Sequence, residues 1–155
     1  MLKGAWKVGI VDILGPVILA LVYISLSSLF KEPNRRSFNA IFIAGAGAAY
    51  LSGGFGIWEF VFLVVVTYCA YRGLRSYGFI CVGWILHTGW DVLHHLYGNP
   101  IVPFVPDSSF GCAITDPVIA LWCFAGAPSV YDLFRGKGRG HQASSDSATQ
   151  PNVRP

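Results

Sequence analysis

The sequence predicts an all-α integral membrane protein, a polytopic bundle of about five helices that cross the bilayer. The first observation is composition: 54% of the residues are hydrophobic and only 12% are charged, whereas about a quarter of the residues in a soluble domain are charged. The second is spacing, because five apolar segments approach the roughly 20 helical residues that cross the apolar core of a bilayer.

We expect the five spans to form a single domain over residues 1–135. They are placed at 8–30, 37–53, 57–74, 77–97 and 116–134. The turn KEPNRR ends the first span, and the Gly- and Ala-rich second span suits close helix packing inside the bundle. Only the short stretch GGFG separates the second and third spans, so these two should form an antiparallel hairpin.

Proline and glycine set the limits of the fifth span. Asp116 and Pro117 are an N-cap and a first-turn proline, which predict a helix start, and Pro128 predicts a kink. Three prolines and two glycines predict that residues 98–115 form a loop, either outside the membrane or re-entrant against protein. The tail 136–155 is basic and then polar, so we expect it to be disordered.

Basic residues set the predicted orientation. On one side of a five-span topology lie eight Lys and Arg residues, and on the other side lie two, Lys3 and Lys7. Since cytoplasmic loops are enriched in Lys and Arg, we expect an outside N-terminus and a cytoplasmic C-terminus in the cell (inner) membrane. Cations at span ends also exclude a nucleic-acid-binding face. A cleaved signal peptide over residues 1–28 is the alternative, but Asp12 and Pro16 interrupt its apolar run.

The segment HTGWDVLHH, residues 87–95, places four titratable groups in the second half of the fourth span. At about 100° per residue, His87, Asp91 and His94 lie on one stripe of the helix. Asp91 is expected about 9 Å and His87 about 15 Å below the outer boundary. Two imidazoles and a carboxylate on one stripe can bind a metal ion or relay a proton. We predict these three residues as metal ligands.

Acidic residues on the outer halves of other spans can join this stripe. We predict Glu59 and Asp91 as the catalytic carboxylates, with a set of additional pocket residues: Asp12, His95, Asp107, Cys112 and Asp116. Structural alternatives stay open. His87 and Asp91 can form a buried pair that only fixes helix packing, and carboxylates near helix N-termini can simply interact with the helix dipole.

These residues favour a metal-dependent membrane enzyme, a hydrolase or a lipid-modifying activity, in which a divalent ion of the zinc or iron class activates water. Expected partners are the bilayer, a small apolar or lipid substrate and, in a homo-oligomer, further copies of the chain. Three alternatives stay open: a small proton, metal-ion or solute transporter, a haem- or quinone-linked redox subunit, and a structural subunit. The inner halves of the spans offer little beyond Ser25, Ser27, Ser28 and Thr67, which favours a pocket over a continuous path.

The stretch HTGWDVLHHLYGNP, followed by CAITDP, resembles a family of small bacterial integral membrane proteins that is classified as a domain of unknown function. The resemblance covers roughly residues 10–134. It implies the membrane topology, and it adds no catalytic assignment because that family has no assigned activity.

Overall fold

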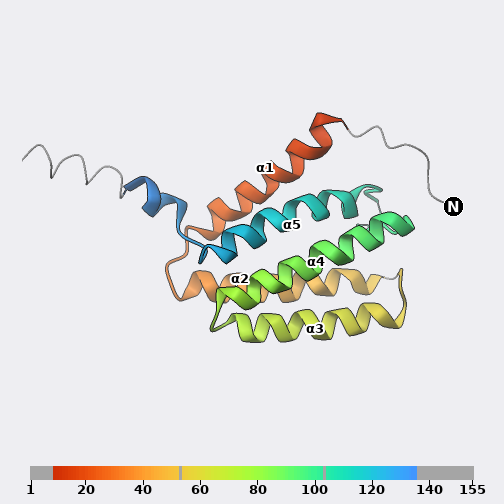
Figure 1. The fold of residues 1–155 in the computed structure, drawn as a ribbon, viewed down its shortest axis with the longest axis horizontal. Helices are drawn as coiled ribbons and strands as arrows, with labels where there is room; N and C mark the ends of the chain where they lie inside the picture. Colours follow the sequence, from red (N-terminus) through yellow and green to blue (C-terminus); the bar gives the residue numbers. More distant parts are fainter. Residues whose placement is uncertain (1–8, 53, 103, 136–155) are drawn as a thin grey trace, which may run out of the picture.

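The computed structural model describes residues 9–52, 54–102 and 104–135, and these ranges are helical with no strand. The helices lie side by side in one bundle (Figure 1). They are α1 (Ile10–Ser27), α2 (Asn34–Ala48), the 3-10 helix η1 (Ala49–Ser52), α3 (Ile57–Gly73), α4 (Tyr77–Tyr97) and α5 (Ser108–Phe124). The predicted disordered tail and Lys3 and Lys7 lie outside the described residues.

Helix α4 lies at the centre of the bundle. It contacts α5, α3 and α2, while α1 packs chiefly against α5 (Figure 1). Its bounds, Tyr77 to Tyr97, coincide with the fourth predicted span, and Gly98 follows it in the left-handed conformation with φ 73°. A left-handed residue is favourable for glycine and commonly ends a helix. This helix therefore carries the motif of residues 87–95 through the middle of the molecule.

The start predicted for the fifth helix at Asp116 was wrong. Helix α5 begins at Ser108 and ends at Phe124, so Asp116 lies in its middle and Pro117 is an internal proline. Asp107, followed by two serines, occupies the N-cap position; these residue types favour helix starts and are the signal that the Asp-Pro pair obscured. The predicted loop 98–115 is correspondingly shorter, and Pro128 follows the helix and does not kink it.

Close packing between α2, α3 and α4 depends on small residues. A Cβ atom on Gly47 would lie 3.2 Å from Val66 Cγ1, and one on Gly83 would lie 2.7 Å from Ile43 Cδ1. Ile43 and Val66 are both fully buried. Gly45, by contrast, has open space beside it. The Gly- and Ala-rich second helix thus packs closely through Gly47 and not through Gly45.

Large apolar side chains cover much of the described surface. Exposed examples on α1 and α5 include Ile10, Val11, Leu121 and Phe124, with 69–79% of each residue accessible. Of the described helices, α1 alone is long and apolar enough to cross a membrane by the criteria of length and composition, and α5 is an apolar helix of 17 residues. The five-span topology stays a prediction.

We expect Gly83→Ala to lower the thermal unfolding midpoint of the purified protein. The added methyl group must displace the buried Ile43, and overpacking of this kind costs about 1–3 kcal/mol. The matched control is Gly89→Ala on the same helix, where a Cβ meets nothing within 4 Å. Equal midpoints for the two variants would contradict the packing described for α2 and α4.

Candidate functional site

The three residues predicted to share a stripe on α4 all face the interior. His87, Asp91 and His94 are exposed by only 2%, 0% and 1%. Neighbouring α4 residues such as Val92 and Leu93 are at least 40% exposed. The helical spacing of the motif therefore predicted correctly which of its side chains turn inward, and His95 is the partly exposed fourth member.

Asp91 belongs to a group that we call the central cluster, formed by Tyr50, His87, Asp91 and Asp116. The Tyr50 hydroxyl donates a hydrogen bond to Asp91 Oδ1 and lies 3.2 Å from His87 Nδ1. His87 Nδ1 is 4.0 Å from Asp116 Oδ2. Residues of η1, α4 and α5 therefore meet at one buried point.

The carboxyl groups of Asp91 and Asp116 are buried at this point without a Lys or Arg partner among the described residues. Asp91 Oδ2 has no hydrogen-bond partner there. Two carboxylates buried near one another disfavour each other's charge, so a proton on one of them is favourable. Asp91 and Asp116 are therefore the two groups of the central cluster that can hold one proton between them.

His94 belongs to a second group, the outer pair, which it forms with Glu59. Glu59 Oε1 lies 3.0 Å from His94 Nε2, and both side chains are at most 3% exposed. Glu59 also accepts hydrogen bonds from the Phe55 backbone N–H at 3.1 Å and from Trp90 Nε1 at 2.8 Å. On the other edge of the ring, His94 Nδ1 is 3.2 Å from the carbonyl oxygen of Asn99. Both ring nitrogens of His94 thus face oxygen atoms.

Tyr50 joins the outer pair to the central cluster. Its ring centroid lies 5.3 Å from that of His87 and 5.1 Å from that of His94. Sequence reasoning missed this residue, because it follows an apolar Gly- and Ala-rich stretch and carries no charge. The only signal was its phenol, since a buried tyrosine hydroxyl usually finds a hydrogen-bond partner.

The other predicted pocket residues divide into near and distant ones. Cys112 is partly buried and packs against the hydrophobic core of the bundle. Asp12 is exposed and accepts a hydrogen bond from the Gly9 backbone N–H at 2.8 Å, so it serves the first turn of α1. Asp107 is exposed at the start of α5, and the ring of His95 lies 5.1 Å from that of Phe110. These last three lie outside the central cluster.

The residues predicted as metal ligands are divided between the two groups. His94 pairs with Glu59, whereas His87 and Asp91 gather with Asp116. Across the ranges that the structure describes, no three His, Cys, Asp or Glu side chains are placed so that together they could hold a metal ion. Metal binding by this set stays a prediction.

Buried polar side chains continue into the inner half of the bundle, contrary to the expectation that few would be found there. Tyr23 donates a hydrogen bond of 2.7 Å to Asn39 Oδ1, and Asn39 Nδ2 donates one of 2.7 Å to Ser27 Oγ. Trp84 lies between this group and His87, with ring centroids 6.1 Å from Tyr23 and 5.6 Å from His87. Its indole Nε1 is buried without a hydrogen-bond partner.

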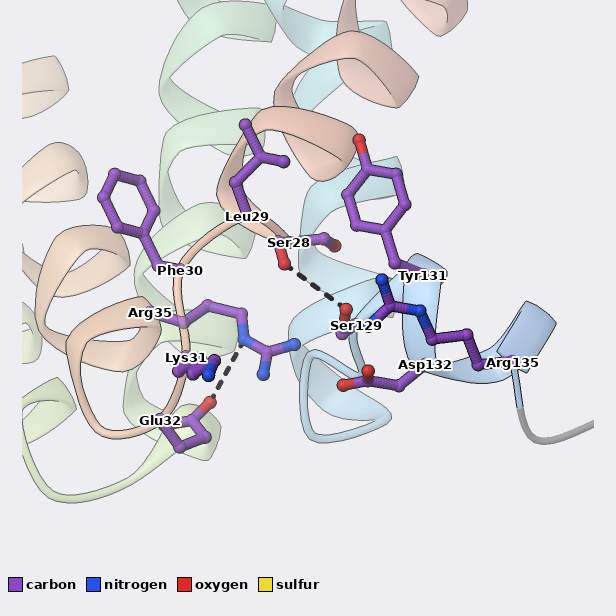
Figure 2. A pocket seen from close by; sticks show the side chains of 10 residues that line it. All are labelled: Ser28, Leu29, Phe30, Lys31, Glu32, Arg35, Ser129, Tyr131, Asp132 and Arg135. Atoms are coloured by element: carbon purple, nitrogen blue, oxygen red, sulfur yellow. Dashed lines mark hydrogen bonds and ion pairs between the residues drawn. The ribbon is translucent and has the colours of Figure 1, made fainter.

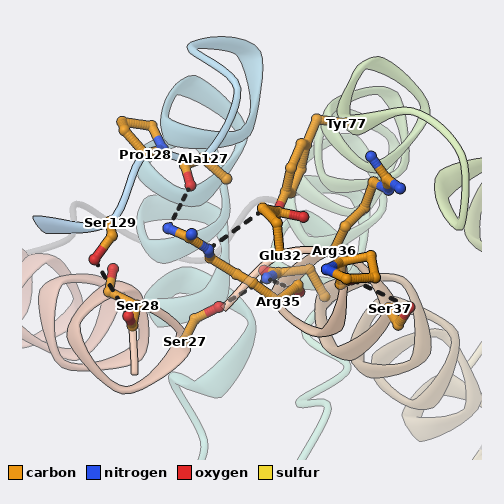
Figure 3. A network of polar contacts seen from close by, with 12 residues as sticks. Ser27, Ser28, Glu32, Arg35, Arg36, Ser37, Tyr77, Ala127, Pro128 and Ser129 are labelled. Atoms are coloured by element: carbon orange, nitrogen blue, oxygen red, sulfur yellow. Dashed lines mark hydrogen bonds and ion pairs between the residues drawn. The ribbon is translucent and has the colours of Figure 1, made fainter. Parts of the chain in front are cut away.

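The line of polar groups ends at a cavity of about 580 Å³ between the end of α1 and the segment after α5 (Figure 2). Arg35 lies at its inner wall. The Arg35 side chain is 8% exposed, its Nε is 3.4 Å from Glu32 Oε1, and its Nη1 donates a hydrogen bond of 3.1 Å to the Ala127 carbonyl (Figure 3). Tyr77 donates to the same Glu32 oxygen at 2.6 Å.

We expect Glu59→Gln to lower the free energy of unfolding by about 1–3 kcal/mol, because a buried amide cannot replace both acceptor oxygens that face Phe55, Trp90 and His94. Chemical or thermal denaturation of the purified protein measures this change. Asp107→Asn is the matched control, since Asp107 is an exposed acid at the same end of the bundle. A Glu59→Gln variant as stable as this control would contradict the contacts described for Glu59.

Comparison with known proteins identifies the family of this chain. No curated protein and no solved structure matches it. The model of DUF6010, described as a family of unknown function, matches residues 11–129, from the second residue of α1 to the connection after α5. That range includes Tyr50, Glu59 and the whole buried face of α4. Since the match covers well over half of the sequence, the chain belongs to the DUF6010 family.

Proposed function

We propose that this chain is a multi-pass protein of the cell (inner) membrane that carries protons along a buried line of polar side chains. The observation that carries the proposal is the placement of two buried carboxyl groups, Asp91 and Asp116, around Tyr50 and His87. These residues are 0% and 5% exposed. Within the described chain neither acid forms an ion pair with a Lys or Arg side chain.

The distribution of side chains supports the membrane setting. The described surface carries many large apolar residues while the titratable groups of α4 are buried, which is the reverse of the usual arrangement in a soluble domain. Trp58 and Tyr97 line an apolar hollow of about 280 Å³ at the outer end, where aromatic residues of membrane proteins gather. Lys31, Arg35 and Arg135 lie at the opposite end. This asymmetry supports an outside N-terminus, with five helices in the bilayer.

The charge of the central cluster supports protons as its cargo. Two carboxylates in an apolar interior repel each other strongly, so a small cation has to be bound between them. A proton fits, because Asp91 Oδ2 is buried without a hydrogen-bond partner among the described residues. Tyr50 donates a hydrogen bond to the other oxygen of Asp91, Oδ1.

His87 offers the next position for the proton. Its Nδ1 is 4.0 Å from Asp116 Oδ2 and 3.2 Å from the Tyr50 hydroxyl. A proton that leaves the carboxyl pair for His87 forms an imidazolium beside two carboxylates, which stabilise it. Return of that proton restores the neutral ring, so one proton can move within the cluster without moving a helix.

Polar groups on both sides of the central cluster support a path across the bundle. Toward the outer end, Tyr50 reaches the pair of Glu59 and His94. Toward the inner end, Trp84 is followed by Tyr23 and Asn39. Trp84 lies between His87 and Tyr23, and its indole is a donor only, so a water molecule or a side-chain rotation must carry the proton across this interval.

We expect Asp91→Asn and Asp116→Asn each to abolish most of the proton flux into proteoliposomes, followed with a pH-sensitive dye under an imposed potential. Removal of a group that takes and gives protons costs about 100-fold or more, and asparagine cannot bind the shared proton. Asp12→Asn is the matched control, because Asp12 is exposed at the start of α1. Its flux should equal that of the wild type.

Two results would overturn the proposal. One is wild-type flux in a folded Asp91→Asn protein. The other is a stoichiometric zinc or iron content that His87→Ala removes, because the metal-dependent enzyme predicted from the sequence would then take the place of a proton carrier. Thermal unfolding of every variant separates both results from a loss of the fold.

A further inference from the structure

We infer that the cavity at the basic end of the bundle binds a phosphate group, and that a phospholipid headgroup supplies it. This cavity of about 580 Å³ lies between the end of α1, the start of α2 and the segment after α5 (Figure 2). Nothing in the proton path uses it. The phosphate site does not depend on the proposed proton transfer, and only the lipid source depends on the membrane setting.

The charges around the cavity favour an anion. Three cations line it, Lys31, Arg35 and Arg135, against two acids, Glu32 and Asp132. Glu32 is already neutralised, because it forms an ion pair with Arg35 and accepts a hydrogen bond from Tyr77. In the part of the chain that the structure describes, Lys31 and Arg135 form no ion pair. The cavity therefore keeps two cations, Lys31 and Arg135, against one remaining acid, Asp132.

Arg35 gives this cavity a fixed wall. Only 8% of its side chain is exposed, and its Nη1 donates a hydrogen bond of 3.1 Å to the Ala127 carbonyl. Its Nε is buried and has no hydrogen-bond partner of good geometry. Figure 2 shows the guanidinium directed into the space between Glu32 and Ser129. A planar guanidinium held in this way matches the geometry of a phosphate group.

Hydroxyl and apolar groups complete the site. Tyr131 lines the same cavity, and its hydroxyl can donate to a phosphate oxygen. The hydroxyls of Ser28 and Ser129 line the cavity too, but they already donate to the backbone carbonyls of Ile24 and Ser28. Leu29 and Phe30 are 65% and 42% exposed there, and exposed apolar side chains beside a phosphate site suit acyl chains. This combination favours a phospholipid over a free phosphate ion.

Binding to the purified full-length protein in detergent tests this inference, with native mass spectrometry as the readout. The probes are a phosphatidic acid, the diacylglycerol with the same acyl chains, and inorganic phosphate. We expect the phosphatidic acid to bind, the diacylglycerol not to bind, and millimolar phosphate to compete weakly. The double variant Lys31→Ala/Arg135→Ala should lower the affinity for phosphatidic acid by about tenfold, equivalent to about 1.4 kcal/mol.

Arg75→Ala is the matched control, because Arg75 is exposed in the turn between α3 and α4 and does not line the cavity. It should leave the affinity unchanged. Equal binding of phosphatidic acid and diacylglycerol would overturn the phosphate site. So would an equal loss of affinity for phosphatidic acid in Lys31→Ala/Arg135→Ala and in Arg75→Ala. Equal affinity for inorganic phosphate and for the lipid would overturn the lipid source. Proton flux through Asp91 and Asp116 is measured separately, so the two proposals can fail independently.

Discussion

The structure depends on one constraint: two acids, Asp91 and Asp116, are buried inside an apolar bundle without a Lys or Arg partner in the described chain. A buried negative charge is expensive unless it is neutralised or hydrogen-bonded. Tyr50 and His87 meet part of this requirement, and we propose that a proton shared by the two acids meets the rest. In that proposal the groups around the two acids donate, accept or hold the proton.

Three helices have to be in register for the central cluster to exist. Helix α4 supplies His87 and Asp91 one turn apart, and the middle of α5 supplies Asp116. Tyr50 reaches them because η1 continues the course of α2 for one further turn. Gly83 lets α4 lie close to Ile43 of α2, which brings that turn against the buried face. The packing and the chemistry are thus set by the same few contacts.

Much of this arrangement could be predicted from local patterns, and the rest could not. The spacing of His87, Asp91 and His94 indicated their shared face because a helix repeats every 3.6 residues. Asp116 was expected to cap a helix, since Asp-Pro is a common start, and the structure instead buries it in mid-helix. The pairing of His94 with Glu59 and the role of Tyr50 depend on tertiary contacts. Tyr23 and Ser27 of α1 meet Asn39 of α2, and this contact between two helices has no local sequence motif.

The central claim is that Asp91 and Asp116 share an exchangeable proton at neutral pH. Infrared spectroscopy of the protein in lipid, recorded in H₂O and in D₂O, tests it most directly through the C=O stretching band of a protonated carboxyl group. The account predicts one such band that shifts in D₂O and disappears in both Asp91→Asn and Asp116→Asn. A wild-type spectrum with only ionised carboxylates, or a band that survives both substitutions, would contradict it.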